Sequence, residues 1–543
     1  MKGACYTLMI VALVKSVQCA IDPAEFTTDF WEDLSLSELE EATNTFENLK
    51  TGKAKNVIML IGDGMSLATI TAGRIRIGQK LGQNGEEYMT SLDSMPHSGI
   101  VKTYSVDHQT PDSASTGTAF LTGVKTRSGL LGVNGAATSC DKVDANKVTT
   151  SMEYAIAAGK SAGVVTTTRI QHATPASTYA HIHRRSLYSD NKKGPSERNC
   201  DDIAMQLFKK RRDIQVILGG GRSHMRPIGA MDEEFSSRGE RFDRRDLIQE
   251  WQDDLGNQSA RYVWNKAQFD AVDPQTTDHL MGLFSPYEMQ YSLNRNTDKG
   301  GEPSLAEMTE KAIKILSKND KGFFLLIESG MLDKAHHQGR AIYALEEFHE
   351  LEKALNVARS LTDAKDTLII TTADHGHMFM IGAGGVRGND VFGLSSSSNN
   401  PRKALDGKYY TTIVYGNGPG HAAKSYNKNA PRQSVQRWQS ASKYYQQQSA
   451  VPLSSETHSA EDVIVYGSGP MSHLLTGVHE QTHIARVVQY AACLGPANEN
   501  EPHCIENSGF ISGTLIEENL LPRVEKDPRL FDESYGGTPE DDV

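Results

Sequence analysis

The stretch that decides the fold is "NVIMLIGDGMS", residues Asn56–Ser66. Its apolar, β-branched first part predicts a strand over Asn56–Ile61 that is buried on both faces. The strand runs into "GDG", so that an acidic side chain, Asp63, follows it between two glycines. Buried strands of this kind are typical of parallel sheets, in which ligands bind beyond the carboxyl ends of the strands.

Further segments repeat this pattern along the chain and alternate with helical ones. The helix after Ser304 opens with a capping box to Glu307, and a second helix is predicted from Arg340 to Leu361. This alternation predicts the α/β class, with a large central, mainly parallel sheet flanked by helices on both faces. The other strands are predicted at Ser161–Thr168, Ile214–Leu218, Gly322–Ile327, Asp366–Thr372 and Asp462–Gly467.

Composition and termini indicate the compartment. Residues 1–20 have a positive start, a short apolar core at Tyr6–Val14 and small residues near Ala20, which predicts a secretory signal peptide. That core is shorter than the roughly 20 apolar residues that span a bilayer. The C-terminal tail, 496–543, has no hydrophobic segment for a glycolipid anchor. We therefore expect a secreted, extracellular, soluble protein with no membrane anchor signal. A net charge of −12 without a basic stripe argues against nucleic-acid binding.

Cysteine usage agrees with an oxidising compartment. Two of the six cysteines leave with the signal peptide, and an even number remains, which predicts two disulfides. Three pairings are possible, and the short separation of Cys493 and Cys504 favours a local loop, which leaves Cys140 with Cys200.

Acidic, histidine and threonine side chains follow four of the predicted strands. Each group alone has an ordinary explanation, such as a turn residue, a helix cap or a solvated histidine, but together they predict a metal cluster. Carboxylate and imidazole ligands suit catalytic Zn²⁺, whereas the set of Asp63, Glu328 and Thr174 suits Mg²⁺. Besides Asp63, the residues concerned are His172, Thr174, Glu328, Asp333, His336, His337, Asp374, His375 and His377.

A serine stands within "TPDSASTGTA", Thr110–Ala119, directly after Asp112. By itself the stretch predicts the start of a helix with small residues. Two metal ions about 3.5–4 Å apart can clamp the attacking and leaving oxygens of a phosphoryl transfer, and one of them would ionise Ser113. "HIHRRS" offers Arg184 and Arg185 as the clamp for the other phosphoryl oxygens.

These motifs resemble the metal-dependent alkaline phosphatases of animal type, and we expect a soluble, insect-like form. The matching motifs occur in the family's order from about residue 50 to residue 495. They are "IGDGMS", "TPDSAST", "TTRIQHATPASTYAH", "ESGMLDKAHH", "TADHGH" and "SSETHSAEDV".

The resemblance implies a phosphomonoesterase that hydrolyses phosphate monoesters through a covalent phosphoserine, with two zinc ions and one magnesium ion. Ser113 would be the nucleophile and Arg185 the phosphate-binding residue, with Arg184 structural. The first zinc would be held by Asp333, His337 and His458, and the second by Asp63, Asp374, His375 and Ser113. Magnesium would be held by Asp63, Thr174 and Glu328. His172 would act through water, and His336 and His377 would be outer-sphere or surface residues.

The resemblance also implies a domain organisation and a homodimer. Residues 21–50 would form an N-terminal arm whose apolar residues, Leu36 to Leu49, either pack on their own domain or reach the second subunit. The phosphatase domain would comprise 51–381 and 454–495. Residues 382–453 are polar and rich in Gly, Ser and Gln, and are interpreted as an insertion equivalent to the family's crown.

The sequence departs from the vertebrate pattern at three points. "DKAHH" replaces the usual residues of the first zinc motif, and Lys334 and Thr174 resemble bacterial members while His172 resembles animal ones. Vertebrate members bind calcium, for which Glu234, the Phe284 carbonyl and Glu302 could serve, but Ser285 replaces a glutamate. Calcium is therefore not among the expected ions. Asp112 either orients Arg185 or caps the helix.

Two other functions fit parts of the pattern. A related phosphodiesterase or sulfatase could use the same scaffold, but no cysteine stands in the Cys-x-Pro-x-Arg motif that a sulfatase needs. A secreted binding protein could keep the fold without catalysis, but the predicted ligand set is complete.

Overall fold

The computed structural model describes residues 22–256, 259–397, 400–420, 434–496, 498 and 500–505. The predicted signal peptide and most of the predicted tail therefore lie outside the described residues. Among those that are described, no helix combines the length and apolar character that crossing a membrane requires. Both predicted disulfides are confirmed, with Cys140 joined to Cys200 and Cys493 to Cys504.

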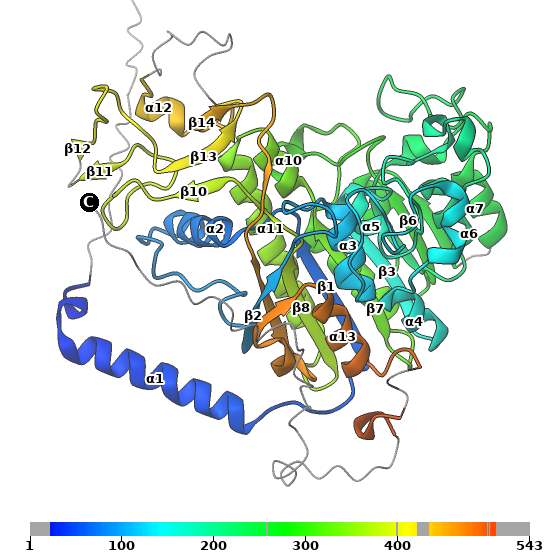
Figure 1. The fold of residues 1–543 in the computed structure, drawn as a ribbon, viewed down its shortest axis with the longest axis horizontal. Coiled ribbons are helices and arrows are strands. Elements are labelled where there is room, and N and C mark those ends of the chain that lie inside the picture. The colour runs from blue at the N-terminus through cyan, green and yellow to red at the C-terminus, as the bar shows by residue number, and fades with distance from the viewer. Residues whose placement is uncertain are drawn as a thin grey trace, which may run out of the picture.

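A ten-stranded sheet forms the centre of the molecule (Figure 1). The strands from β8 to β5 run parallel, and β16 is antiparallel to both of its neighbours, which confirms the predicted, mainly parallel sheet. Across the sheet the order is β17 (Gly477–Glu480), β2 (His97–Lys102), β16 (Val463–Ser468), β8 (Thr367–Ala373), β1 (Asn56–Gly62), β7 (Phe323–Ser329), β3 (Ser161–Arg169), β4 (Val216–Gly220), β6 (His279–Leu283) and β5 (Ala260–Val263).

Helices cover both faces of this sheet, as expected (Figure 1). On one face α11 (Ala341–Ser360) packs against α9 (Leu305–Leu316), α2 (Leu67–Lys80) and the central strands. The other face carries α3 (Ser113–Thr122), α4 (Ser151–Ala157), α5 (Ala173–Ala176) and α13 (Thr482–Ala491). The capping box of Ser304 and Glu307 is present, and the apolar residues of α9, among them Leu305, Met308, Ala312 and Leu316, are buried. Burial on both sides explains why the central strands are apolar throughout.

Shorter elements complete the fold. The helix α10 (Met331–His337) follows β7, and β9 (Gly376–His377) pairs with β15 (His458–Ser459) beyond the end of β8. Within the predicted insertion, β13 (Ile413–Gly418) and β14 (Ser449–Pro452) form a separate small sheet with β10 (Phe379–Ile381). The remaining short elements include α6 (Ile203–Lys209), α7 (Leu247–Leu255), α8 (Lys266–Asp270), α12 (Arg437–Ser440), β11 (Ser396–Ser397) and β12 (Asn400–Pro401).

The N-terminal helix, α1 (Thr28–Glu47), stands off from the body of the molecule (Figure 1). None of its residues is buried, and the side chains of Leu36, Leu39 and Phe46 are 63%, 63% and 69% exposed. The polar side of α1 instead faces the body across a cavity of about 430 Å³, lined by residues that include Glu40, Asn44 and Lys50. Among the described residues, these three apolar side chains therefore have no packing on their own domain, whereas Leu49, two residues beyond α1, is partly buried.

Candidate metal centre and nucleophile

Four adjacent strands, β8, β1, β7 and β3, bring the predicted ligands to one edge of the sheet. Asp63 follows β1, Asp374 and His375 follow β8, and Thr174 lies on α5 after β3. Glu328 is the penultimate residue of β7, where it lies level with Ile61 of β1 and Thr166 of β3. Because the carboxyl ends of parallel strands meet at one edge, segments far apart in sequence contribute to one site.

One group of donors is centred on Asp333 of α10. Its Oδ1 lies 3.2 Å from Nε2 of His337 and 3.2 Å from Nε2 of His458, and these two nitrogens are 3.2 Å apart. The Nδ1 atom of His337 lies 2.6 Å from the Glu456 carbonyl, and that of His458 lies 2.9 Å from the Pro111 carbonyl. A carbonyl can only accept a hydrogen bond, so both rings carry their proton on Nδ1 and present Nε2 as a lone pair to a metal.

A second group surrounds Ser113, the first residue of α3. Its Oγ lies 3.3 Å from Nε2 of His375, and the same nitrogen lies 3.2 Å from Asp374 Oδ2 and 3.5 Å from Asp63 Oδ1. All four side chains are buried. No described residue donates a hydrogen bond to either carboxylate oxygen of Asp63. Buried carboxylates are normally paired or coordinate a metal, so this arrangement suits a cation between Asp63 and Ser113.

A third group lies on the other side of Asp63. Ligand atoms of Asp63, His172 and Glu328 all lie within 4.8 Å of one another. Glu328 accepts hydrogen bonds on Oε2 from Thr166 and Thr168, while its Oε1 is buried without a partner among the described residues. Burial raises the pKa of Glu328 to about 7, although the hydroxyls of Thr166 and Thr174 act in the opposite direction. The carboxylates of Asp63 and Glu328 are oxygen donors, which suit a hard cation, whereas His172 brings a nitrogen to the same group.

The two adjacent arginines point to different surroundings. Arg185 binds Asp112 Oδ2 at 2.9 Å through Nη1, and its Nη2 lies 3.3 Å from Nε2 of His172. Arg184 instead binds Glu197 at 2.8 Å and the Lys192 carbonyl, away from this group. Arg185 is thus the arginine that the structure places beside the predicted centre.

Asp112 performs both of the tasks that the sequence left open. Its Oδ1 accepts hydrogen bonds from the backbone N–H of Ser115, at 3.2 Å, and of Gly129, at 3.0 Å. Its Oδ2 binds Arg185, and this guanidinium lowers the pKa of Asp112 in spite of burial. The residue before the serine therefore caps α3 and orients Arg185 at the same time.

The buried carboxylates repel one another when no cation is present. Burial, followed by Asp374 and Asp333, raises the pKa of Asp63 well above its ordinary value, and burial also raises that of Asp374. The pKa of Asp333 lies well below its ordinary value because Lys334 and His337 outweigh the effect of burial. Cations bound among these groups would relieve the repulsion, so the donors fit a metal centre.

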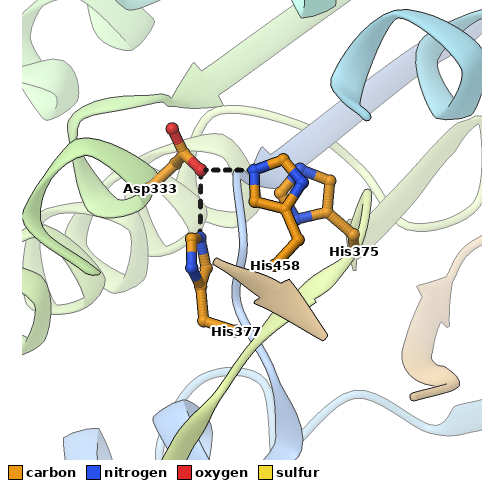
Figure 2. A group of neighbouring side chains, drawn as sticks. All are labelled: Asp333, His375, His377 and His458. Carbon is orange, nitrogen blue, oxygen red and sulfur yellow. Dashed lines mark hydrogen bonds and ion pairs between the residues drawn. The ribbon is translucent and has the colours of Figure 1, made fainter. Parts of the chain in front are cut away.

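Two histidines expected at the outer sphere or the surface are fully enclosed. His336 lies on α10 and contacts Thr69 and the Tyr415 hydroxyl, at 3.1 and 2.8 Å. His377 is 1% exposed and lies 3.0 Å from Asp333 Oδ1, as Figure 2 shows. Neither is at the surface. The spacing of His375 and His377 could not reveal this, because it depends on the pairing of β9 with β15.

Sequence reasoning also missed the side chain on the other side of His377. Glu456 lies two residues before His458 and is buried, with Oε2 2.6 Å from Nδ1 of His377. Burial disfavours a charge on His377, but Glu456 and Asp333 outweigh it and raise the pKa of His377 to about 10. The only available signal was its place within the motif "SSETHSAEDV".

A separate acidic cluster contains two of the residues considered for calcium. Glu234 accepts a hydrogen bond from the Gly300 N–H, and Glu302 accepts one from the Gln290 N–H at 2.8 Å. Asp298, which the sequence did not single out, adds a third carboxylate, and neither of its buried oxygens has a hydrogen-bond partner among the described residues. Burial raises the pKa of Asp298 to about 6 and that of Glu302 to about 8. The cluster thus offers oxygen donors without a glutamate at position 285.

Comparisons with known proteins place this geometry in context. The family model "alkaline phosphatase" matches residues 54–494. The tissue-nonspecific alkaline phosphatase of the cat is 45% identical over 88% of this chain and 90% of its own, and that of human is 44% identical over 91% and 93%. The alkaline phosphatase of the cod Gadus morhua is 44% identical over 86% and 97%.

Solved structures show the same fold. The alkaline phosphatase of the Antarctic bacterium TAB5 covers 82% of this chain and 99% of its own, with a TM-score of 0.55 at 22% identity. That of Thermus thermophilus covers 83% and 93%, with a TM-score of 0.59 at 22% identity.

Proposed function

This chain belongs to the alkaline phosphatase family and is a phosphatase, and from that premise we propose that it hydrolyses phosphate monoesters through a phosphoserine formed on Ser113. The family is metal-dependent, and the donor sets described above fit two zinc ions and one magnesium ion. Zinc would be held by the set around Asp333 and by the set around Ser113, and magnesium by the set around Glu328.

The single observation that carries the proposal is the position of Ser113. Its Oγ lies among His375, Asp374 and Asp63, while its backbone begins helix α3. Metal ions bound there would lower the pKa of the hydroxyl and neutralise the transferred phosphoryl group. Asp112 already binds the backbone N–H groups of Ala114 and Ser115, so it is the positive end of the helix dipole that favours an anion at the same place.

Arg185 positions the phosphoryl group in this proposal. Its guanidinium is held by Asp112 on one side and faces His172 on the other. A planar guanidinium binds two phosphoryl oxygens at once, which fixes the phosphorus in line with Ser113 Oγ. The alcohol leaves, and hydrolysis of the phosphoserine then releases inorganic phosphate and restores the serine.

Phosphate release from matched chromogenic mono- and diesters, with and without a chelator, tests the proposal. We expect the monoester to be hydrolysed faster than the diester, and the activity to be lost on chelation and restored by zinc with magnesium. Equal or faster hydrolysis of the diester would favour a phosphodiesterase instead, and unchanged activity after complete metal removal would contradict the mechanism.

Secretion and dimer formation belong to the same proposal. The two disulfides suit an oxidising compartment, and residues 1–20 have the pattern of a signal peptide. The apolar side of α1 has no partner among the described residues, and a second copy of the chain would bury it. We expect a homodimer in which each arm contacts the other subunit.

A further inference from the structure

Glu456 is a fully enclosed carboxylate that no step of the proposed mechanism uses. Its Oε2 lies 2.6 Å from Nδ1 of His377, and its Oε1 accepts the backbone N–H of Met378 at 2.7 Å. Its carbonyl lies 2.6 Å from Nδ1 of His337, and its N–H donates to the His337 carbonyl at 2.9 Å. One residue therefore contacts β9, the residue that follows it and the end of α10 through four polar atoms.

Both histidines that Glu456 contacts lead to the same carboxylate oxygen. His377 Nε2 lies 3.0 Å from Asp333 Oδ1, and His337 Nε2 lies 3.2 Å from that atom. Figure 2 shows His377 and His458 converging on Asp333 from two directions. Glu456, His377 and Asp333 form a carboxylate–histidine–carboxylate chain. Separately, the Glu456 carbonyl holds the imidazole ring of His337 in its orientation.

We propose that Glu456 is a positioning residue for the zinc ion held by Asp333, His337 and His458. Through His377, its side chain fixes the orientation of the Asp333 carboxylate, while its backbone carbonyl, which any residue at this position supplies, fixes the tautomer of His337. The inference rests on the proposed function, because it assumes that these three side chains bind zinc.

The contacts of His377 exclude it from direct coordination in this arrangement. A ligating imidazole needs one nitrogen free of a proton, but His377 faces a carboxylate oxygen at each nitrogen. Both ring nitrogens of His377 are thus occupied by carboxylate contacts, and neither faces an open position. Glu456 is likewise engaged at both carboxylate oxygens. Outer partners of this kind orient the ligands, and their removal typically costs about 10- to 100-fold in metal affinity.

The test compares zinc binding by the wild-type protein and by Glu456→Gln. A glutamine has one acceptor oxygen, whereas Glu456 serves two donors, so either His377 or Met378 loses its hydrogen bond. Each protein is dialysed against buffers of graded free zinc with magnesium held constant, and bound metals are measured by mass spectrometry. We expect the midpoint of one zinc site to shift about 10- to 100-fold, with the other zinc and the magnesium unchanged.

Two further variants separate positioning from general damage. Thr457→Val changes the next residue, whose exposed side chain contacts Asn417 in the insertion, and should bind zinc as the wild type does. His377→Gln should shift the same zinc midpoint, and the double variant should shift it by less than the sum, because both act along one path. Melting of the metal-free proteins reports damage to the fold independently of zinc.

The outcomes distinguish this inference from the proposed function. A wild-type protein that binds no zinc would overturn both. A wild-type protein with two zinc ions and an unshifted Glu456→Gln midpoint would overturn the inference alone. A variant whose metal-free form melts lower while its zinc midpoint is unchanged would also overturn it, because Glu456 would then serve stability only.

Discussion

Asp112 and Arg185 form an ion pair at 2.9 Å whose acidic member also caps the helix that begins at Ser113. The nucleophile and the phosphate-binding side chain are thereby held by one residue, although 73 positions separate Asp112 from Arg185. A shift of the helix start would move both the proposed nucleophile and its phosphate clamp, so the geometry of the reaction depends on Asp112.

Two substitutions at Asp112 separate its two contacts. Asparagine keeps an oxygen that can cap α3 but removes the charge, whereas alanine removes both. Both variants lose the ion pair with Arg185, so we expect Asp112→Ala to be less stable than Asp112→Asn by about 1 kcal/mol, the usual value of a helix cap. Thermal melting of the two variants measures this difference, and equal melting temperatures would show that the cap contributes nothing.

Arg185→Ala should weaken the binding of inorganic phosphate. A hydrogen bond to a charged group contributes about 1.5–3 kcal/mol, which corresponds to a rise of about 10- to 100-fold in the inhibition constant of phosphate. Arg184→Ala is the matched control, because that side chain binds Glu197 and the Lys192 carbonyl. Steady-state kinetics with phosphate as inhibitor measures both variants, and a stronger effect at Arg184 would reverse the assignment.

Glu153 should stabilise the fold at neutral pH and lose this effect in acid. Burial raises its pKa, but His181 and Lys210 outweigh burial and lower it from 4.5 to about 2. A depressed folded-state pKa contributes stability above the unfolded value, which is lost as the pH falls through the folded one. Glu153→Gln should therefore cost up to about 3 kcal/mol at pH 7, and the gap should close between about pH 4.5 and pH 2.

Denaturant unfolding of the two metal-free proteins over this pH range measures the gap, so that loss of metal in acid does not interfere. Glutamine can keep the capping box with Thr150, which leaves the ion pairs as the main difference between the proteins. A gap that stays constant down to pH 2 would contradict the role assigned to the pairs of Glu153.

Substitutions on the outer side of α1 should dissociate the proposed homodimer. Trp31, Leu39 and Phe46 are 51%, 63% and 69% exposed in the single chain, and buried large side chains contribute about 1.5–3 kcal/mol each. Replacing all three by alanine should shift the protein to the monomer, whereas Asn44→Ala, on the side of α1 that faces the body, should not. Light scattering after size-exclusion chromatography gives the molecular mass. A triple variant that remains a dimer would show that α1 does not hold the two subunits together.

The sequence predicted the centre of the sheet well and its edges poorly. The six predicted strands all occur. They could be predicted because strands buried on both faces are continuous apolar runs in the sequence. Four strands of this sheet, β2, β5, β6 and β17, were not predicted. Of these, β2, β5 and β17 contain partly or fully exposed residues and have no continuous apolar run. Short edge strands have little apolar pattern to detect.

The residues of the site likewise divide into those that the sequence could reveal and those that it could not. Ligand candidates such as Asp63 and Asp374 could be recognised because they directly follow strong strands. Glu456 and the enclosure of His377 could not, because both depend on the pairing of His377 with His458 across β9 and β15. Asp112 could be assigned to neither task from sequence, since its two oxygens act separately.

The most direct test of the central claim is the identification of a phosphoserine at position 113. The zinc- and magnesium-loaded protein is incubated with inorganic phosphate in mild acid, quenched, digested and analysed by peptide mass spectrometry. We expect one added phosphoryl group on the peptide that contains Ser113, no such group in Ser113→Ala, and at least about a thousandfold loss of monoester hydrolysis in that variant. Phosphorylation at another residue, or full activity of Ser113→Ala, would contradict the account.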